Sequence, residues 1–215
     1  MPFGGAAKNL ATRFGVTMGA GLAFERAGTQ RVTTQLTFSW DNARLGAHSI
    51  LRVRTPEKEI RTVVTFTGQS LSVPAGATAL MQFGATAREA ATPGDLNAEI
   101  TAARSASSPD TFGTSSTPVV GLAQGIAMPF GDGRVVVLGE AGFLSAQIIR
   151  YPNGSHVRFG MNVPGNDNQQ FALNVLHGFL SCWANFLPRD GTACPVAVIP
   201  IETSAGWWYR THELV

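Results

Sequence analysis

The chain has 215 residues, a formal net charge of +2, 44% hydrophobic residues and 14% charged residues, which is typical of a globular protein and excludes an intrinsically disordered one. The 16 basic residues are scattered, so no run of positive charge predicts contact with nucleic acid. No apolar stretch reaches the ~18 residues of a membrane span, and the N-terminal residues lack the pattern of a secretory signal. We therefore expect a cytoplasmic protein that contacts neither nucleic acid nor membrane.

The N-terminal part of the chain predicts one helix followed by short strands. In residues 6–14 apolar side chains recur at the i, i+3, i+4 and i+7 positions of an amphipathic helix, and Gly15 is a suitable residue to end it. Residues 33–40 alternate polar and apolar side chains, and residues 60–67 are rich in β-branched residues, so both are expected to be strands. A third strand is expected at residues 78–83.

The middle of the chain predicts an irregular segment and then a strongly apolar strand. Residues 84–118 are rich in Ala, Thr, Ser, Gly and Pro, which favours an irregular surface excursion with a helical turn or two. Residues 119–128 are expected to form a strand. Residues 134–138 hold four consecutive apolar residues between glycine-containing turns, the pattern of a strand buried on both faces at the centre of a parallel sheet. Glu140 then lies at the carboxyl end of that strand, where open α/β sheets bind ligands.

The last third of the chain predicts one long helix and a separate tail. Asp167 and Gln170 have the spacing of a capping box, so Asp167 is expected to cap a helix that runs from Asn168 to about residue 180, rather than to bind a ligand. Apolar residues cover most of the circumference of this helix, so it is expected to be largely buried. Residues 181–215 are expected to form a C-terminal appendage that packs on the domain or mediates self-association.

Six segments of the chain together carry a family resemblance. They are Met1–Ala7, His48–Ile50, Val64–Ser70, Gly139–Gln147, Gly160–Asn162 and Asp167–His177. These segments resemble a group of uncharacterised bacterial proteins with a class I glutamine-amidotransferase-like domain, which is also found in the trehalose-utilisation (ThuA-like) proteins. The resemblance implies an α/β fold over residues 1–180, with a mostly parallel, flavodoxin-like sheet between two layers of helices.

The resemblance also bears on the beginning of the chain. In this group of proteins the Pro2–Gly5 segment follows a strand and precedes a helix, so the resemblance implies that the first strands of the sheet are missing and that the chain is truncated at its N-terminus. We expect the edge of the incomplete sheet to be covered by the tail or by a second subunit, because an uncovered edge strand tends to pair with other chains.

The residues needed for amidotransferase chemistry are not all present. Class I amidotransferases use a cysteine nucleophile on a tight turn between a strand and a helix. Neither Cys182 nor Cys194 follows a strand with glycines at that spacing, so hydrolysis of glutamine is not expected. The sequence contains neither a phosphate-binding loop nor a dinucleotide-binding glycine motif, so it predicts no nucleotide cofactor. A divalent metal held by Glu140 remains open.

The candidate site residues are polar residues at expected strand ends and in adjacent loops. If they converge, Glu140 would act as a base or metal ligand and His48 as its acid partner. Glu140 can instead cap the helix that follows it, and His177 can be a hydrogen-bonded residue of the core. The residues expected to position a substrate are Gln69, Gln147, Asn162, Asn168 and His177.

Three functions follow from these observations. The preferred one is binding of a small molecule without glutamine amidotransferase activity. The second is hydrolysis of a small ester, lactone, amide or sugar-linked substrate by Glu140 and His48, with or without a metal, and a cavity shared by these two residues would favour it. The third is a structural subunit of a homo-oligomer, with its interface formed by the tryptophans Trp183, Trp207 and Trp208.

Overall fold

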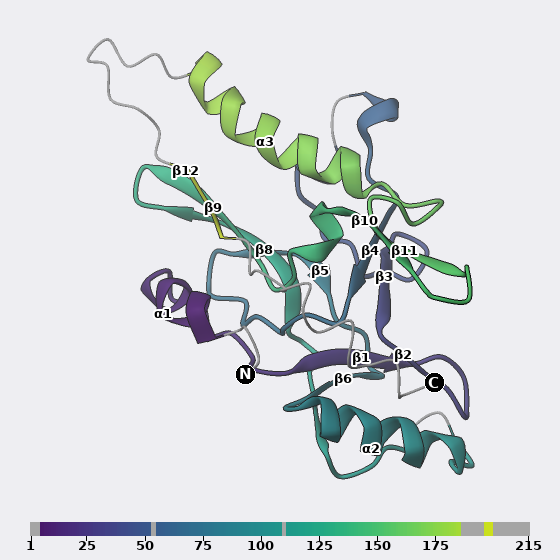
Figure 1. Cartoon of the computed structure of the whole chain (residues 1–215). Helices are drawn as coiled ribbons and strands as arrows, with labels where there is room; N and C mark the ends of the chain where they lie inside the picture. Colours follow the sequence, from purple (N-terminus) through teal and green to yellow (C-terminus); the bar gives the residue numbers. More distant parts are fainter. Residues whose placement is uncertain (1–4, 53–54, 109–110, 186–195, 200–215) are drawn as a thin grey trace.

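The structure, a computed structural model, describes residues 5–52, 55–108, 111–185 and 196–199. Within these ranges the strands form four small sheets, and three α-helices lie at the periphery (Figure 1). Helix α3 crosses one end of the molecule and α2 covers the other (Figure 1). Each strand or helix expected from the sequence overlaps an observed element, although the bounds differ by a few residues.

The central sheet contains the apolar strand that the sequence predicted. The strand order is β12-β9-β8-β5, in which β8 pairs antiparallel with both β5 and β9. The C-terminal strand β12 pairs in parallel with β9 and so provides the edge strand beside it. The bounds are β5 (Thr78–Gln82), β8 (Ala123–Phe130), β9 (Gly133–Leu138) and β12 (Val196–Ile199).

The expected flavodoxin-like α/β fold with a mostly parallel sheet is wrong. Among the described strands, every pair except β9–β12 is antiparallel. Strand β9 is apolar because both of its faces are covered: Val136 and Leu138 belong to one core cluster, whereas Val135 and Val137 belong to another. An unbroken run of apolar residues therefore indicates that both faces of the strand are buried. It does not indicate the direction of the neighbouring strands, because both faces can be buried in an antiparallel sheet as well.

Different elements cover the two faces of the central sheet. Helix α1 (Gly5–Arg13) provides Ala11 to the cluster that contains Val135 and Val137. Phe14 follows this helix and packs edge-on against Phe130, with 4.8 Å between the ring centroids. The larger cluster on the other face includes residues of the antiparallel pair β3 (Gln35–Ser39) and β4 (Thr62–Phe66), of the loop that joins these two strands, and of α3 (Asn168–Asn185).

Residues 84–118 are more regular than the sequence indicated. They contain two strands and a 12-residue helix, because Thr92 accepts the N–H of Asp95 at 3.1 Å and Pro93 occupies the first turn, a strong start for a helix. The strands belong to a second sheet of order β2-β1-β6-β7, which α2 covers (Figure 1). The bounds are β1 (Leu22–Arg26), β2 (Val32–Thr33), β6 (Ala87–Ala90), α2 (Pro93–Arg104) and β7 (Ser116–Pro118).

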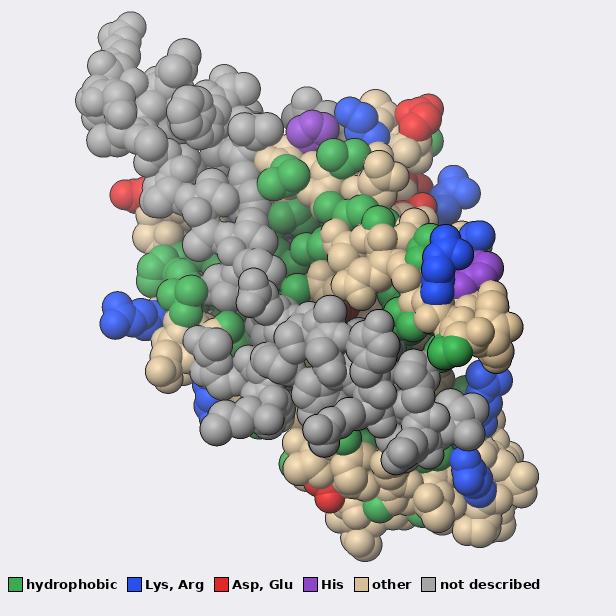
Figure 2. Space-filling model, viewed as in Figure 1, with side chains coloured by type: hydrophobic (Ala, Val, Ile, Leu, Met, Phe, Trp, Pro, Cys, Tyr) green, Lys and Arg blue, Asp and Glu red, His purple; other side chains and the backbone are tan. Residues whose placement is uncertain are grey.

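A two-stranded hairpin lies beside the β3–β4 pair. Its inner side packs through Phe159, whose ring meets that of Phe66 at a centroid distance of 5.1 Å. Its outer side exposes Arg150, His156 and Arg158, and basic side chains gather at this edge in Figure 2. The remaining bounds are η1 (Pro56–Lys58), η2 (Gly142–Leu144), β10 (Ala146–Arg150) and β11 (His156–Gly160).

Helix α3 begins where the sequence predicted but is less buried than expected. Leu173 and Leu176 are 42% and 54% exposed, so only one side of the helix packs on the core. The helix continues to Asn185, past the expected domain boundary at residue 180. In the part of the chain that the structure describes, no helix is both long enough and apolar enough to cross a membrane. Trp207, Trp208 and Cys194 lie outside the described residues.

Candidate functional site

Glu140 caps a short helix and is closed off from solvent. Its carboxylate accepts the N–H groups of Gly142 and Phe143, the latter at 2.9 Å, at the start of η2. Burial raises its pKa to about 7, and these hydrogen bonds oppose that shift only in part. Such a pKa suits a general base, but the side chain is 1% exposed and lines neither of the two cavities described below. Of the two roles open to Glu140, the geometry supports the structural one.

His48 lies at the other end of β9. It lines a cavity together with Arg134 and Val135, which begin that strand, whereas Glu140 follows the end of the strand. Six residues of extended chain separate Arg134 from Glu140, a span of roughly 20 Å. The structure therefore does not bring the Glu140 carboxylate and the His48 imidazole into one cavity.

Asn168 joins the start of α3 to β4. Its side-chain Oδ1 accepts the N–H of Val64 at 3.0 Å, and its Nδ2 donates to the carbonyls of Val64 at 2.7 Å and Phe143 at 3.2 Å. The amide therefore bonds to β4 in the way a neighbouring strand would. Because the side chain is fully buried and its hydrogen-bonding groups are occupied, Asn168 serves the fold in this geometry rather than a ligand.

Asp167 strengthens the same connection instead of capping α3. Its carboxylate accepts the N–H groups of Arg61 at 2.7 Å and Thr62 at 2.9 Å. The expected capping box is therefore wrong, since the amide of Gln170 donates to Asn174 at 2.8 Å and not back to residue 167. The spacing of Asp167 and Gln170 predicts the start of the helix correctly. The carboxylate of Asp167, however, binds main-chain N–H groups that are distant in sequence and not those of the helix.

The remaining candidate residues do not converge on one site. Gln69 is buried beside Gly139, and its Oε1 has no hydrogen-bond partner among the described residues. Asn162 donates to the main-chain carbonyl of Gln147 at 3.2 Å, a bond at the base of the β10–β11 hairpin. His177 is exposed on α3, so it is not a hydrogen-bonded residue of the core. Within the described ranges, no group of three or more His, Cys, Asp and Glu residues is placed to hold a metal ion.

A cavity of about 440 Å³ is lined by the segment that leads into β1, by residues of β6 and β7, and by Ser70 in the loop after β4. Glu89, from β6, and Ser70 line it, and both are more than nine-tenths buried. Glu89 lies in the middle of the sheet, because β6 pairs with β1 on one side and β7 on the other. The other lining residues are Gly19, Ala20, Gly21, Ala91, Thr114, Ser115, Ser116, Thr117, Pro118, Val119 and Leu122.

Three hydrogen bonds hold the Glu89 carboxylate in place. Oε1 accepts the N–H of Gly21 at 2.5 Å, and Oε2 accepts the N–H of Ser70 at 3.1 Å as well as its hydroxyl proton. Gly19 passes so close that a Cβ at this position would collide with both carboxylate oxygens, which explains why a glycine is present. The carboxylate is therefore fixed by groups from two separate segments, and its orientation is set before any ligand arrives.

The wall of this cavity combines one carboxyl group with hydroxyl groups and apolar side chains. Of the residues that line it in the described chain, Glu89 alone has an ionisable side chain. No basic side chain in the described ranges forms an ion pair with Glu89, since the ion pair found there joins Arg44 to Glu25. Buried carboxylates are normally paired or bound to a cation, whereas Glu89 has three hydrogen-bond donors and no charged partner in the described chain.

Sequence reasoning did not find Glu89 because the signals around it are weak. Residues 87–90 form a four-residue strand inside a segment rich in small and polar residues, and a single Glu there is typical of a solvated surface. The one local hint is the pair of glycines at 19 and 21, which allow close approach of a neighbouring group. Ser70 ends the Val64–Ser70 segment of the family resemblance, and nothing in its local sequence indicates a binding role.

Comparison with protein-family models, with curated proteins and with solved structures gives no match to this chain. The resemblance to amidotransferase-like proteins therefore stays a prediction from the sequence segments that carry it.

Proposed function

We propose that the chain is a small-molecule-binding protein and that its ligand is a small organic cation, such as a primary amine, held by Glu89. The observation that carries this proposal is a buried carboxylate, 7% exposed, that lines a cavity of about 440 Å³ without a basic partner in the described chain. The volume lies in the ~300–1,000 Å³ range of small-molecule pockets.

The lining residues support an amine in preference to an anion or a purely apolar ligand. An ammonium group donates up to three hydrogen bonds, and Glu89 together with the hydroxyls of Ser70 and Thr114 offers acceptors for them. Val119 and Leu122 provide apolar contact for the remainder of the ligand. An anion would be repelled by the negative charge of the Glu89 carboxylate.

Glutamine hydrolysis forms no part of this proposal. Cys182 lies inside α3, and neither cysteine has the nucleophile motif around it in the sequence. The hydrolase alternative would need Glu140 and His48 to face one substrate, and the geometry gives it no support. A cytoplasmic location and a homo-oligomeric state stay predictions from the sequence.

We expect Glu89→Gln to weaken amine binding by roughly tenfold or more, because a charge-assisted hydrogen bond is replaced by a neutral one. Calorimetric titration of the full chain with propylamine, cyclohexylamine and benzylamine measures the effect. Cyclohexanol and benzyl alcohol are matched neutral probes that should bind more weakly than the corresponding amines. The control variant Glu57→Gln removes one exposed carboxylate elsewhere and should leave the affinities unchanged.

A second variant distinguishes weaker binding that is caused by a blocked cavity from weaker binding that is caused by misfolding. Ala20→Phe places a ring at the wall of the cavity and leaves Glu89 and its hydrogen bonds in place, so it should weaken amine binding while circular dichroism and thermal stability stay near those of the wild type. The proposal is overturned if none of the three amines binds, or if each alcohol binds as tightly as its amine.

A further inference from the structure

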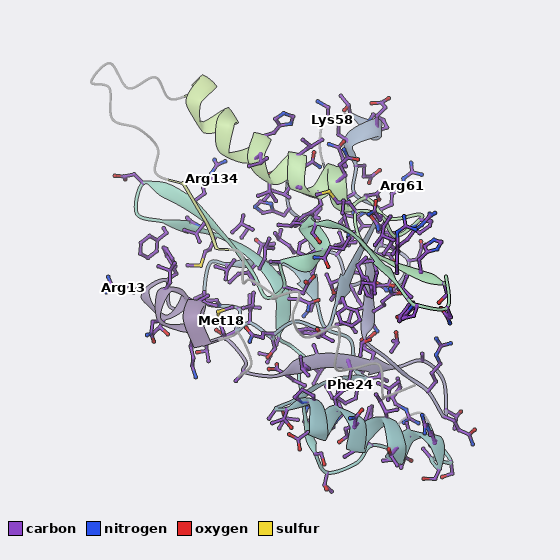
Figure 3. All side chains as sticks on the ribbon, viewed as in Figure 1. Arg13, Met18, Phe24, Lys58, Arg61 and Arg134 are labelled. Carbon is purple, nitrogen blue, oxygen red and sulfur yellow. The ribbon has the colours of Figure 1, made fainter. Side chains whose placement is uncertain are left out.

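A second cavity, of about 150 Å³, lies between α3 and the β8–β9 hairpin. It shares no lining residue with the Glu89 cavity, so it can be considered independently of the proposed function. Figure 3 labels Arg134, the second residue of β9, whose side chain lies on the side of the strand that faces α3. The lining residues are His48, Ser49, Ile50, Gly76, Thr78, Ala127, Met128, Pro129, Arg134, Val135, Val136 and Gly178.

The charged and ionisable groups of this cavity are both basic. Arg134 is exposed at the mouth and forms no ion pair with a carboxylate of the described residues. Burial, and then the positive charge of Arg134, lower the pKa of His48, so the guanidinium acts on the imidazole across the cavity. The Nδ1 atom of His48 accepts the N–H of Ile50 at 3.2 Å, which places the proton of the neutral ring on Nε2. No acceptor for this proton is found among the described residues.

The rest of the wall is apolar and limits the size of a ligand. Ile50, Ala127 and Val136 are each at most 5% exposed and form part of the larger core cluster. A volume of about 150 Å³ corresponds to roughly five water molecules at their share of liquid volume, which is enough for a carboxylate with a few carbon atoms. The cavity therefore combines a cationic mouth with a short apolar interior.

We propose that this cavity binds a small carboxylate with a short alkyl chain, with the carboxylate on Arg134 and His48 and the chain against Ile50, Ala127 and Val136. The planar guanidinium can form two parallel hydrogen bonds to a carboxylate, and the imidazole N–H adds a third donor. Inorganic phosphate would satisfy the same donors but would leave the apolar wall without contact. Carboxylate and phosphate thus share the recognition chemistry and differ in how they fill the cavity.

The test is calorimetric titration of the full chain with butyrate, butyramide and inorganic phosphate. We expect butyrate to bind more tightly than both other probes. Arg134→Gln and His48→Asn should each weaken butyrate binding by roughly tenfold or more, from the loss of hydrogen bonds to a charged group. In His48→Asn the side-chain oxygen can still accept the N–H of Ile50, so the local loop keeps its bond. The matched control is Arg150→Gln, an exposed arginine on the outer side of the β10–β11 hairpin.

Two further measurements test whether butyrate binds inside this cavity. Gly178→Leu fills the cavity from α3 while Arg134 and His48 remain, and since a Cβ at Gly178 would meet Ile50 at an ordinary 3.7 Å, the variant should fold and lose butyrate binding. In the NMR spectrum of the wild type, butyrate should shift the ring signals of His48 but not those of His156. The proposal fails if phosphate or butyramide matches butyrate, if Arg150→Gln weakens binding as much as Arg134→Gln, or if Gly178→Leu binds butyrate as the wild type does.

Discussion

Asn168→Ala is expected to destabilise the protein by about 3 kcal/mol, because it removes three hydrogen bonds that tie α3 to β4 and η2. The substitution leaves the N–H and carbonyl of Val64 without the side-chain partner that Asn168 provides, as well as the carbonyl of Phe143. A buried group that loses its partner costs about 1–3 kcal/mol, and the side chain of Asn168 is fully buried. For a chain of this length the loss corresponds to a melting temperature lower by roughly 6–12 °C.

Urea denaturation of the wild type and of Asn168→Ala measures this loss of stability. Two other variants test whether the loss is specific to the hydrogen bonds of Asn168. Asn162→Ala removes one 3.2 Å bond from a half-buried side chain and should cost less than about 1 kcal/mol. Asn168→Asp keeps the shape and one acceptor but loses both donors, so it should be at least as unstable as Asn168→Ala. Equal destabilisation by Asn168→Ala and Asn162→Ala would show that Asn168 does not anchor the helix.

Local signals in the sequence located most of the elements correctly. The helix before Gly15, the apolar strand that ends at Leu138 and the helix that begins at Asn168 all follow from periodicity and turn residues within a few positions of each element. Such patterns report which faces of an element are buried. They do not report the direction of the neighbouring strand, and this is why a run of valines in β9 suggested a parallel sheet.

The contacts that decide the candidate sites join segments far apart in the sequence. Asn168 lies 104 residues from Val64, and Glu89 is fixed by Gly21 and Ser70, which are 68 and 19 residues away. No spacing rule predicts such pairs, because the fold and not the local chain brings them together. The polar residues that look most like a catalytic set in the sequence therefore do not lie together in the fold. The buried acid of the larger of the two cavities lies instead in a segment for which the sequence predicts an irregular structure.

The glycine at position 68, next to Gln69, is also required by contacts with residues distant in sequence. Its φ of +86° and its packing leave no room for a Cβ, which would collide with the amide of Gln124 and the Cβ of Glu140. Thr67 and Gly68 both have positive φ values, so the chain bends sharply after β4. At this bend Gly68 packs against the side chain of Glu140, and this contact depends on the packed fold and not on the local sequence.

Replacement of Glu140 by Gln is expected to remove a pH dependence of stability worth about 3 kcal/mol between pH 4.5 and pH 8. The pKa of Glu140 rises from 4.5 to about 7 in the folded protein because the carboxyl group is buried. Between these two values the folded protein retains a proton that the unfolded chain has lost, so stability from this group is full below pH 4.5 and is lost as the pH rises through 7. A difference of about 2.5 pKa units corresponds to about 3 kcal/mol.

The measurement is the free energy of unfolding in urea at pH 4.5, 6 and 8 for the wild type and for Glu140→Gln. Other groups also titrate over this range, so the informative quantity is the difference between the two proteins. Wild type should lose stability relative to Glu140→Gln as the pH rises, whereas Glu57→Gln, which removes an exposed carboxylate, should follow the wild type throughout. A constant difference between wild type and Glu140→Gln would mean that the carboxyl group is ionised in the folded protein at all three pH values. The N–H groups of Gly142 and Phe143 would then outweigh the effect of burial, and Glu140 would act as a charged cap of η2.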